Sequence, residues 1–176
     1  FKPDDTWQVP KLCMYLKITI AETCLSASTV VLTRLMADTP TLPVSRHDPY
    51  ARLSADVAAT LSAHTWPAAH PWTSTFPGLP TGDVVDTTVS IDLGWSKNQP
   101  LGLYAPPGDV VTIRVPSDYV NSGFKVQVSE RYDDLRNLDH IETWRRAPVL
   151  LRNFDVISEV TEVGSGYGGA LYLVVP

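Results

Sequence analysis

The stretch LGLYAPPGDVVTIRVP, residues 101–116, specifies one turn more sharply than any other part of the sequence. An apolar run leads into two prolines and a glycine, and a run that alternates apolar with polar residues follows. Pro107 stands at the second turn position, where its fixed φ fits. Gly108 stands at the third, where a type II turn requires a positive φ. The stretch therefore predicts a strand, a type II turn and a second strand.

The rest of the chain after about residue 84 also predicts short strands, separated by Pro/Gly turns. Apolar and polar residues alternate in TTVSIDL, DVVTIRV and FKVQVSE, and the chain closes with the apolar GGALYLVVP, residues 168–176. We expect the two runs that flank the Pro-Gly turn to form an antiparallel hairpin, with Leu101 or Leu103 opposite the row of Val111 and Ile113. Several short strands of this kind favour a β-sandwich.

A second glycine turn is expected in VGSGYGG, residues 163–169, with Gly168 and Gly169 entering the last strand. Its overlapping Gly-x-Gly pairs lack the lysine and the following helix of a phosphate-binding loop. The stretch therefore predicts a structural turn.

The first part of the chain predicts helix. Residues up to about 43 fit a helical period roughly. Asp48 is a candidate N-cap with Pro49 at the first helical position. Apolar residues then recur every four positions, at Leu53, Val57 and Leu61, before a Pro/Trp-rich loop. We divide the chain into a helical N-terminal region with this loop, residues 1–74, and a β-sandwich, residues 75–176, so the predicted fold is mainly β with α.

Composition excludes some classes of protein. Of 176 residues, 44% are hydrophobic and 19% charged, the net charge is -5, and the longest basic run is Arg145-Arg146. Nucleic acids and anionic membranes need clustered cations, so neither is an expected partner. No apolar stretch reaches the roughly 18 residues that a membrane span requires. Because the sequence starts at Phe1 without a signal pattern, we expect it to be a piece of a longer protein.

The two cysteines, Cys13 and Cys24, are eleven positions apart. If one helix spans them, the rise of about 1.5 Å per residue separates them by about 16 Å, too far for a disulfide. We expect two free thiols.

Five stretches, met in order from Thr75 to Pro176, resemble the enhancin-like metallopeptidases, zinc enzymes that cut mucins and other glycoproteins. They are also similar to the TRP-channel-associated factors, the non-peptidase relatives of those enzymes. The stretches are TFPGLP, the run from Ile91 to Trp95, GLYAPPGDVVTIRVP, FKVQVSERYDDLRNLDHIETWRRAPVLLRNF, and YGGALYLVVP. The resemblance implies a β-sandwich that precedes a catalytic domain.

The zinc chemistry of the resembled family depends on H-E-x-x-H, in which two His bind the metal and the Glu activates water. The four histidines of this chain show no such spacing: His47, His64, His70 and His140. We therefore expect no catalytic residue, no metal ligand and no cofactor in this chain. The resemblance implies that any zinc belongs to the parent protein, outside these residues.

One surface could bind a glycan or a protein partner, because Trp and Arg side chains stack on sugar faces or hold anions. Its candidates are Trp66, Trp72, Trp144, Arg145 and Arg146. The competing interpretation is that the Trp rings anchor their loops to the fold and that the Arg stems pack over Trp144.

An acidic cluster interleaved with arginines has a similar choice of interpretations. Its carboxylates belong to Asp133, Asp134, Asp139 and Glu142. The spacing is not that of an EF-hand loop. A solvated loop with local ion pairs, a metal site and a partner contact are the three alternatives.

Three functions follow from these observations. The first is a non-catalytic β-sandwich that supports the catalytic domain of a glycoprotein-directed enhancin-like peptidase. The second is an interaction or scaffold module of a non-peptidase relative within a protein assembly, and the third is a carbohydrate-binding domain. The partner is the rest of the parent polypeptide, a protein assembly or a glycoprotein. A peptidase implies a secreted or cell-surface location and a scaffold an intracellular one, so the location stays open.

Overall fold

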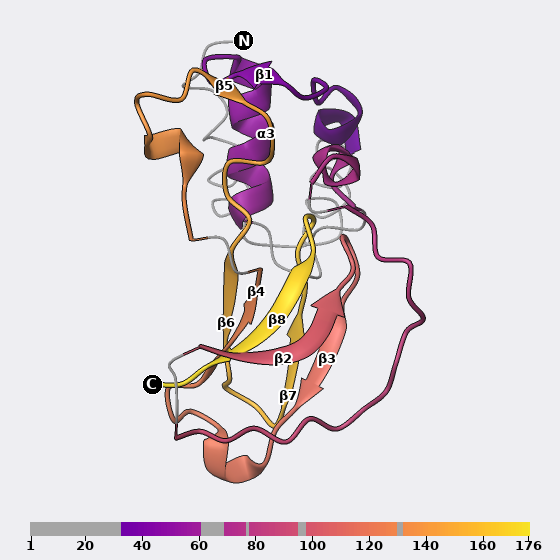
Figure 1. Ribbon diagram of the computed structural model, residues 1–176, viewed down its shortest axis with the longest axis vertical. Coiled ribbons are helices and arrows are strands. Elements are labelled where there is room, and N and C mark those ends of the chain that lie inside the picture. Colours follow the sequence, from indigo (N-terminus) through magenta and orange to yellow (C-terminus); the bar gives the residue numbers. More distant parts are fainter. Residues whose placement is uncertain (1–32, 61–68, 77, 95–97, 130–131) are drawn as a thin grey trace, which may run out of the picture. The chain divides into compact units, whose positions relative to one another are not determined.

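The computed structural model describes residues 33–60, 69–76, 78–94, 98–129 and 132–176 (Figure 1). Most of the predicted helical N-terminal stretch, residues 1–32 with Cys13 and Cys24, lies outside these residues, as do Leu61, His64 and Trp66. The chain divides into two compact units, Phe1–Asp38 and Thr39–Pro176. In the first unit, residues 33–37 are helical and Arg34 forms an ion pair with Asp38 one turn later, with 2.6 Å between Nε and Oδ2.

The second unit is mainly β, which confirms the predicted fold class, and its sheets are antiparallel. It contains helix α3 (Pro49–Thr60), and 3₁₀ turns cover Pro71–Ser74, Ser117–Tyr119 and Leu135–Asn137. The strands are β1 (Val44–Ser45), β2 (Asn98–Ala105), β3 (Val111–Arg114), β4 (Lys125–Val128), β5 (Thr143–Trp144), β6 (Arg152–Asp155), β7 (Val160–Val163) and β8 (Gly169–Val174). They form one four-stranded sheet in the order β2-β8-β4-β6 and two pairs, β3-β7 and β1-β5. The division of the chain at residue 74 stays a prediction.

The turn at Pro106–Asp109 joins two different sheets. The N–H of Asp109 donates to the carbonyl oxygen of Pro106 at 3.2 Å, and Gly108 has a φ of 81°, the value that a type II turn needs at its third position. However, β2 pairs with β8 and β3 pairs with β7. The prediction of a hairpin is therefore wrong: β2 and β3 do not pair with each other, because the turn crosses from one sheet to the facing one.

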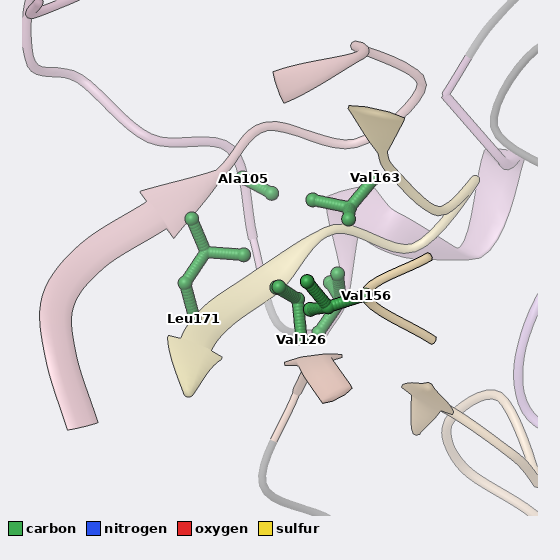
Figure 2. Packing of buried hydrophobic residues seen from close by; sticks show 6 residues of the cluster. Ala105, Val126, Val156, Val163 and Leu171 are labelled. Atoms are coloured by element: carbon green, nitrogen blue, oxygen red, sulfur yellow. The ribbon is translucent and has the colours of Figure 1, made fainter. Parts of the chain in front are cut away.

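The core lies between these sheets. Its most buried members are 0–2% exposed and come from both sheets and the β6–β7 connection: Ala105, Val126, Val128, Val156, Val163 and Leu171. Figure 2 shows five labelled members of this group, whose side chains converge from four strands and, at Val156, from the β6–β7 connection. Leu101 and Leu103 pack against the group from one sheet, and Val111 and Ile113 from the other. The leucines of β2 and the apolar residues of β3, predicted to be neighbours in one hairpin, therefore contact the core from opposite sides.

A predicted strand is missing at residues 87–93. The sequence TTVSIDL alternates as a strand does, but no strand is assigned anywhere in residues 78–94. Alternation of apolar and polar residues predicts only which side chains face inward. A ladder also needs a partner edge, which the local sequence does not supply.

Helix α3 begins as predicted. The N–H of Ala51 donates to Oδ1 of Asp48 at 2.8 Å, so Asp48 caps the helix and Pro49 is its first residue. The buried face differs from the prediction: Leu53 and Val57 are only half-buried. The buried positions are small residues, Ala51, Ser54, Ala55 and Ala58. Small side chains allow a helix to approach its neighbours closely. The face of α3 that is buried is therefore the one with the smallest side chains and not the one with the most hydrophobic side chains.

Candidate functional site

Two glycine turns that lie far apart in the sequence meet in one place, which we call the motif junction (residues 105–108, 129 and 165–169). The N–H of Gly108 donates to the carbonyl oxygen of Ser165 at 2.9 Å. Gly168 has a φ of 65°, and a Cβ atom there would lie 2.6 Å from the carbonyl oxygen of Ala105. A side chain at this position would therefore collide with the Pro-Pro-Gly turn, so the glycine is a packing requirement.

The segment of residues 69–76 is anchored on the same junction. The N–H of His70 donates to the carbonyl oxygen of Gly166 at 2.8 Å. The imidazole ring of His70 lies 4.8 Å from the Trp72 ring and 4.7 Å from the Tyr167 ring, measured between centroids. His70 is 0% exposed. No motif in the sequence predicts this role for His70. Its only sequence signal is its position before Pro71, where it caps the Pro71–Ser74 turn.

His70 and Ser54 lie close enough to resemble a nucleophile and its base, with 2.8 Å between Ser54 Oγ and His70 Nε2. The backbone N–H of Trp72 donates to His70 Nδ1 at 3.2 Å, so Nδ1 is an acceptor. Burial lowers the pKa of His70 to about 3, so the ring is neutral and its proton is on Nε2. Nε2 therefore donates to Ser54 and cannot take the serine proton, as a general base must. The pair joins α3 to the junction.

The hydroxyl group of Tyr167 is equally unsuited to acid–base chemistry near neutral pH. Its residue is 2% exposed, and burial raises the pKa of the phenol well above its usual range. The group stays neutral, and the ring serves as a packing surface for His70.

The acidic cluster is an ion-pair network. Arg136 contacts Asp134 at 2.7 Å and Asp56 of α3 at 2.6 Å. The hydrogen bond from Arg136 lowers the pKa of Asp134 below its usual value. The other carboxylates each face a basic side chain, in the pairs Asp133–Arg146, Asp139–Arg46 and Glu142–His47. Within the described part of the chain, no three His, Cys, Asp or Glu residues gather in a way that could hold a metal ion.

Among the described residues, which exclude Trp66, the structure does not assemble the proposed Trp/Arg surface. Trp72 is 2% exposed and Trp144 is 0% exposed, so of the two interpretations these rings fit the anchoring of their loops and not a face offered to a sugar. Nε1 of Trp72 donates to the carbonyl oxygen of Pro40 at 2.7 Å, and Trp144 pairs with Val44 between β5 and β1. Both rings anchor segments that lie far apart in the sequence. Arg145 is exposed, whereas Arg146 is held by Asp133 and by the carbonyl oxygen of Ala147.

Comparison with known proteins places these features in a family. Residues 83–176 match the model of the N-terminal domain of M60-like peptidases. A TRPM8 channel-associated factor homolog from Danio rerio is 32% identical over 101 residues, which cover 57% of this chain and 11% of that protein. A homolog from Xenopus laevis is 36% identical over 74 residues, 42% of this chain and 8% of that protein. TRPM8 channel-associated factor 3 from Rattus norvegicus is 32% identical over 75 residues, 43% of this chain and 8% of that protein.

The chain thus spans about a tenth of the length of these relatives. No solved structure matches it. Among the described residues, no helix is long and apolar enough to cross a membrane. The family match covers more than half of the chain and includes both turns of the motif junction, which confirms the resemblance drawn from the sequence. The chain therefore belongs to the family of N-terminal domains of M60-like peptidases.

Proposed function

We propose that this chain is the non-catalytic β-domain of an enhancin-like zinc metallopeptidase directed at glycoproteins, and that it supports the catalytic domain of that enzyme. The observation that carries the proposal is the family match over residues 83–176. The motif junction supports it, because its most sharply specified residues hold strands together. The Ser54–His70 pair that joins α3 to the junction also supports it, because the pair is oriented against nucleophilic chemistry.

The residues of this chain do not fit a catalytic zinc ion. The sequence lacks H-E-x-x-H, and within the described residues no group of three candidate ligands occurs. The proposal therefore assigns zinc to parts of the parent protein outside this chain, and assigns to this chain the mechanical task of holding an adjoining domain in place.

The test uses the full-length parent protein, purified with zinc and incubated with mucin. We expect cleavage that a chelator abolishes and that added zinc restores. A second arm introduces Gly169→Ala, which breaks the motif junction, with Gly82→Ala as the matched control. The first variant should lower the temperature at which peptidase activity is lost, and the control should not. A full-length protein that retains no zinc and cleaves no glycoprotein would contradict the proposal.

A second candidate function is that of an interaction module within a protein assembly. It is favoured by one observation: the relatives described above carry the name TRPM8 channel-associated factor. In the same experiment, this candidate predicts no bound zinc and a stable complex with another protein. A carbohydrate-binding domain is less well supported, because Trp72 and Trp144 are buried. Binding of the isolated chain to mucin-type glycans on an array would revive it.

A further inference from the structure

One long segment of the second unit leaves its backbone hydrogen-bonding groups unused. We call residues 79–93 the strap. Figure 1 shows it as a trace without arrow or coil that leads round the outside of the strands to β2. Within the described chain, no strap residue donates or accepts a backbone hydrogen bond. Its N–H and C=O groups are therefore available to a partner.

The strap has the composition of a β-strand. Its residues 83–93, DVVDTTVSIDL, include six β-branched side chains and no glycine or proline. β-branched residues favour the extended conformation, and proline would remove ladder donors. The composition of the strap thus favours a β-strand, but the strap has no neighbouring strand among the described residues.

Its two halves differ in how they are held. The second half sits over an apolar hollow of about 360 Å³, which strap residues 87–89, 91 and 93 line together with core-facing side chains that include Leu103, Ile113 and Phe124. The intervening Ser90 and Asp92 are exposed. The first half packs much less against the protein, since Val84 is 93% exposed and Val85 is 64% exposed. The second half is therefore anchored while the first half is presented to solvent.

The charge of the strap selects the kind of partner. Asp83, Asp86 and Asp92 are its only charged residues. A second copy of the strap would place like charges side by side, which opposes pairing between identical chains. We propose that residues 83–88 pair, as an added β-strand, with the edge of a partner protein's sheet that carries Lys or Arg side chains. This inference does not depend on the peptidase assignment, because it rests on the free backbone groups, the exposure and the charges of the strap.

The test adds a soluble basic strand, the peptide Lys-Thr-Val-Lys-Val-Thr-Lys, to the whole chain and follows amide hydrogen exchange and fluorescence anisotropy. Pairing should slow exchange at every second amide of residues 83–88. The counterpart peptide with Glu in place of Lys should bind at least tenfold more weakly.

Two adjacent variants give the matched control. Val84→Pro and Val85→Pro each remove one N–H, and neighbouring N–H groups in a strand point in opposite directions. We expect one variant to weaken binding at least fivefold and the other less than twofold, with both retaining the wild-type melting temperature. The proposal is overturned if the amides of residues 83–88 exchange at the same rate with and without the peptide, if both variants bind as the wild type does, or if these amides are already protected in the free protein.

Discussion

A Cβ atom placed on Gly169 would lie 2.8 Å from both Cα and the backbone nitrogen of Ser129. The last strand of the four-stranded sheet therefore begins in direct backbone contact with the residue that follows β4, and the first residue of β8 has to be glycine. Its φ of 148° adds a second reason, because L-residues rarely adopt that conformation.

Gly169→Ala should lower the free energy of unfolding by about 2–4 kcal/mol, because the new methyl group meets backbone that has little freedom to move. The measurement is urea unfolding of the purified chain. Gly82→Ala is the control, since a Cβ there meets nothing within 4 Å. It should change stability by no more than about 0.5 kcal/mol. Equal stabilities for the two variants would contradict the close approach of Gly169 to Ser129.

Gly108→Val should also destabilise the domain, by about 1–2 kcal/mol, because Gly108 has a φ of 81° and a β-branched residue tolerates a positive φ poorly. Gly108→Asn is the matched variant and should cost less, since asparagine accepts such conformations more readily. Thermal unfolding of the two variants distinguishes the cases. If valine and asparagine lower the melting temperature equally, backbone strain is not the cause.

Stability should fall as the pH falls below about 6.5, and His70 should cause part of this loss. Burial lowers the pKa of His70 to about 3 in the folded state, whereas an unfolded histidine titrates near 6.5. Below that value the unfolded chain binds the extra proton and the folded chain does not, so the folded state loses up to about 1.4 kcal/mol for each further pH unit until the pH nears 3.

The check is the urea midpoint between pH 7.5 and 4.5 for the wild type and His70→Asn. Asparagine can still accept the hydrogen bond from the Trp72 N–H, and it does not titrate. The variant should be less stable at pH 7.5 but should depend less steeply on pH. Parallel pH profiles would show that another group is responsible.

The Arg136–Asp56 ion pair should stabilise the attachment of α3 by a modest amount. A double-mutant cycle with Arg136→Met and Asp56→Asn should give a coupling energy of about 0.5–1 kcal/mol, smaller in high salt, because the Asp56 side chain is 43% exposed. The control cycle uses Lys125 and Asp155, whose side chains are 45% and 68% exposed. That pair should couple more weakly, and an equal value would mean that the bridge to α3 has no special role.

Local features of the fold could be predicted because their causes lie within a few residues. Asp48 caps α3 through a side chain three positions from Ala51, and Gly108 supplies its positive φ whatever surrounds it. The inward-facing side of β3 follows from alternation. In β4, Val126 and Val128 face the core as alternation predicts, but Gln127 between them is buried as well. The family could be recognised for the same reason, since its motifs are these turns and strands.

Parts of the candidate site could not be predicted, because they depend on distant segments. His70 meets Ser54 and Tyr167 only after α3 and the second glycine turn have packed together, and no spacing in the sequence encodes that encounter. The Trp rings, which could equally have been a ligand surface, are buried because β1 pairs with β5 and because Trp72 reaches the carbonyl of Pro40.

The sequence by itself determined the type II turn, the helix cap, the alternation of the strands and the absence of H-E-x-x-H, because each is a property of neighbouring residues. Only the tertiary structure decided that β2 and β3 belong to facing sheets and that the strap stays unpaired within the described chain. The physical reason is that ladder hydrogen bonds join groups remote in sequence: every extended segment offers the same N–H and C=O groups, and packing of the whole core selects which of them meet.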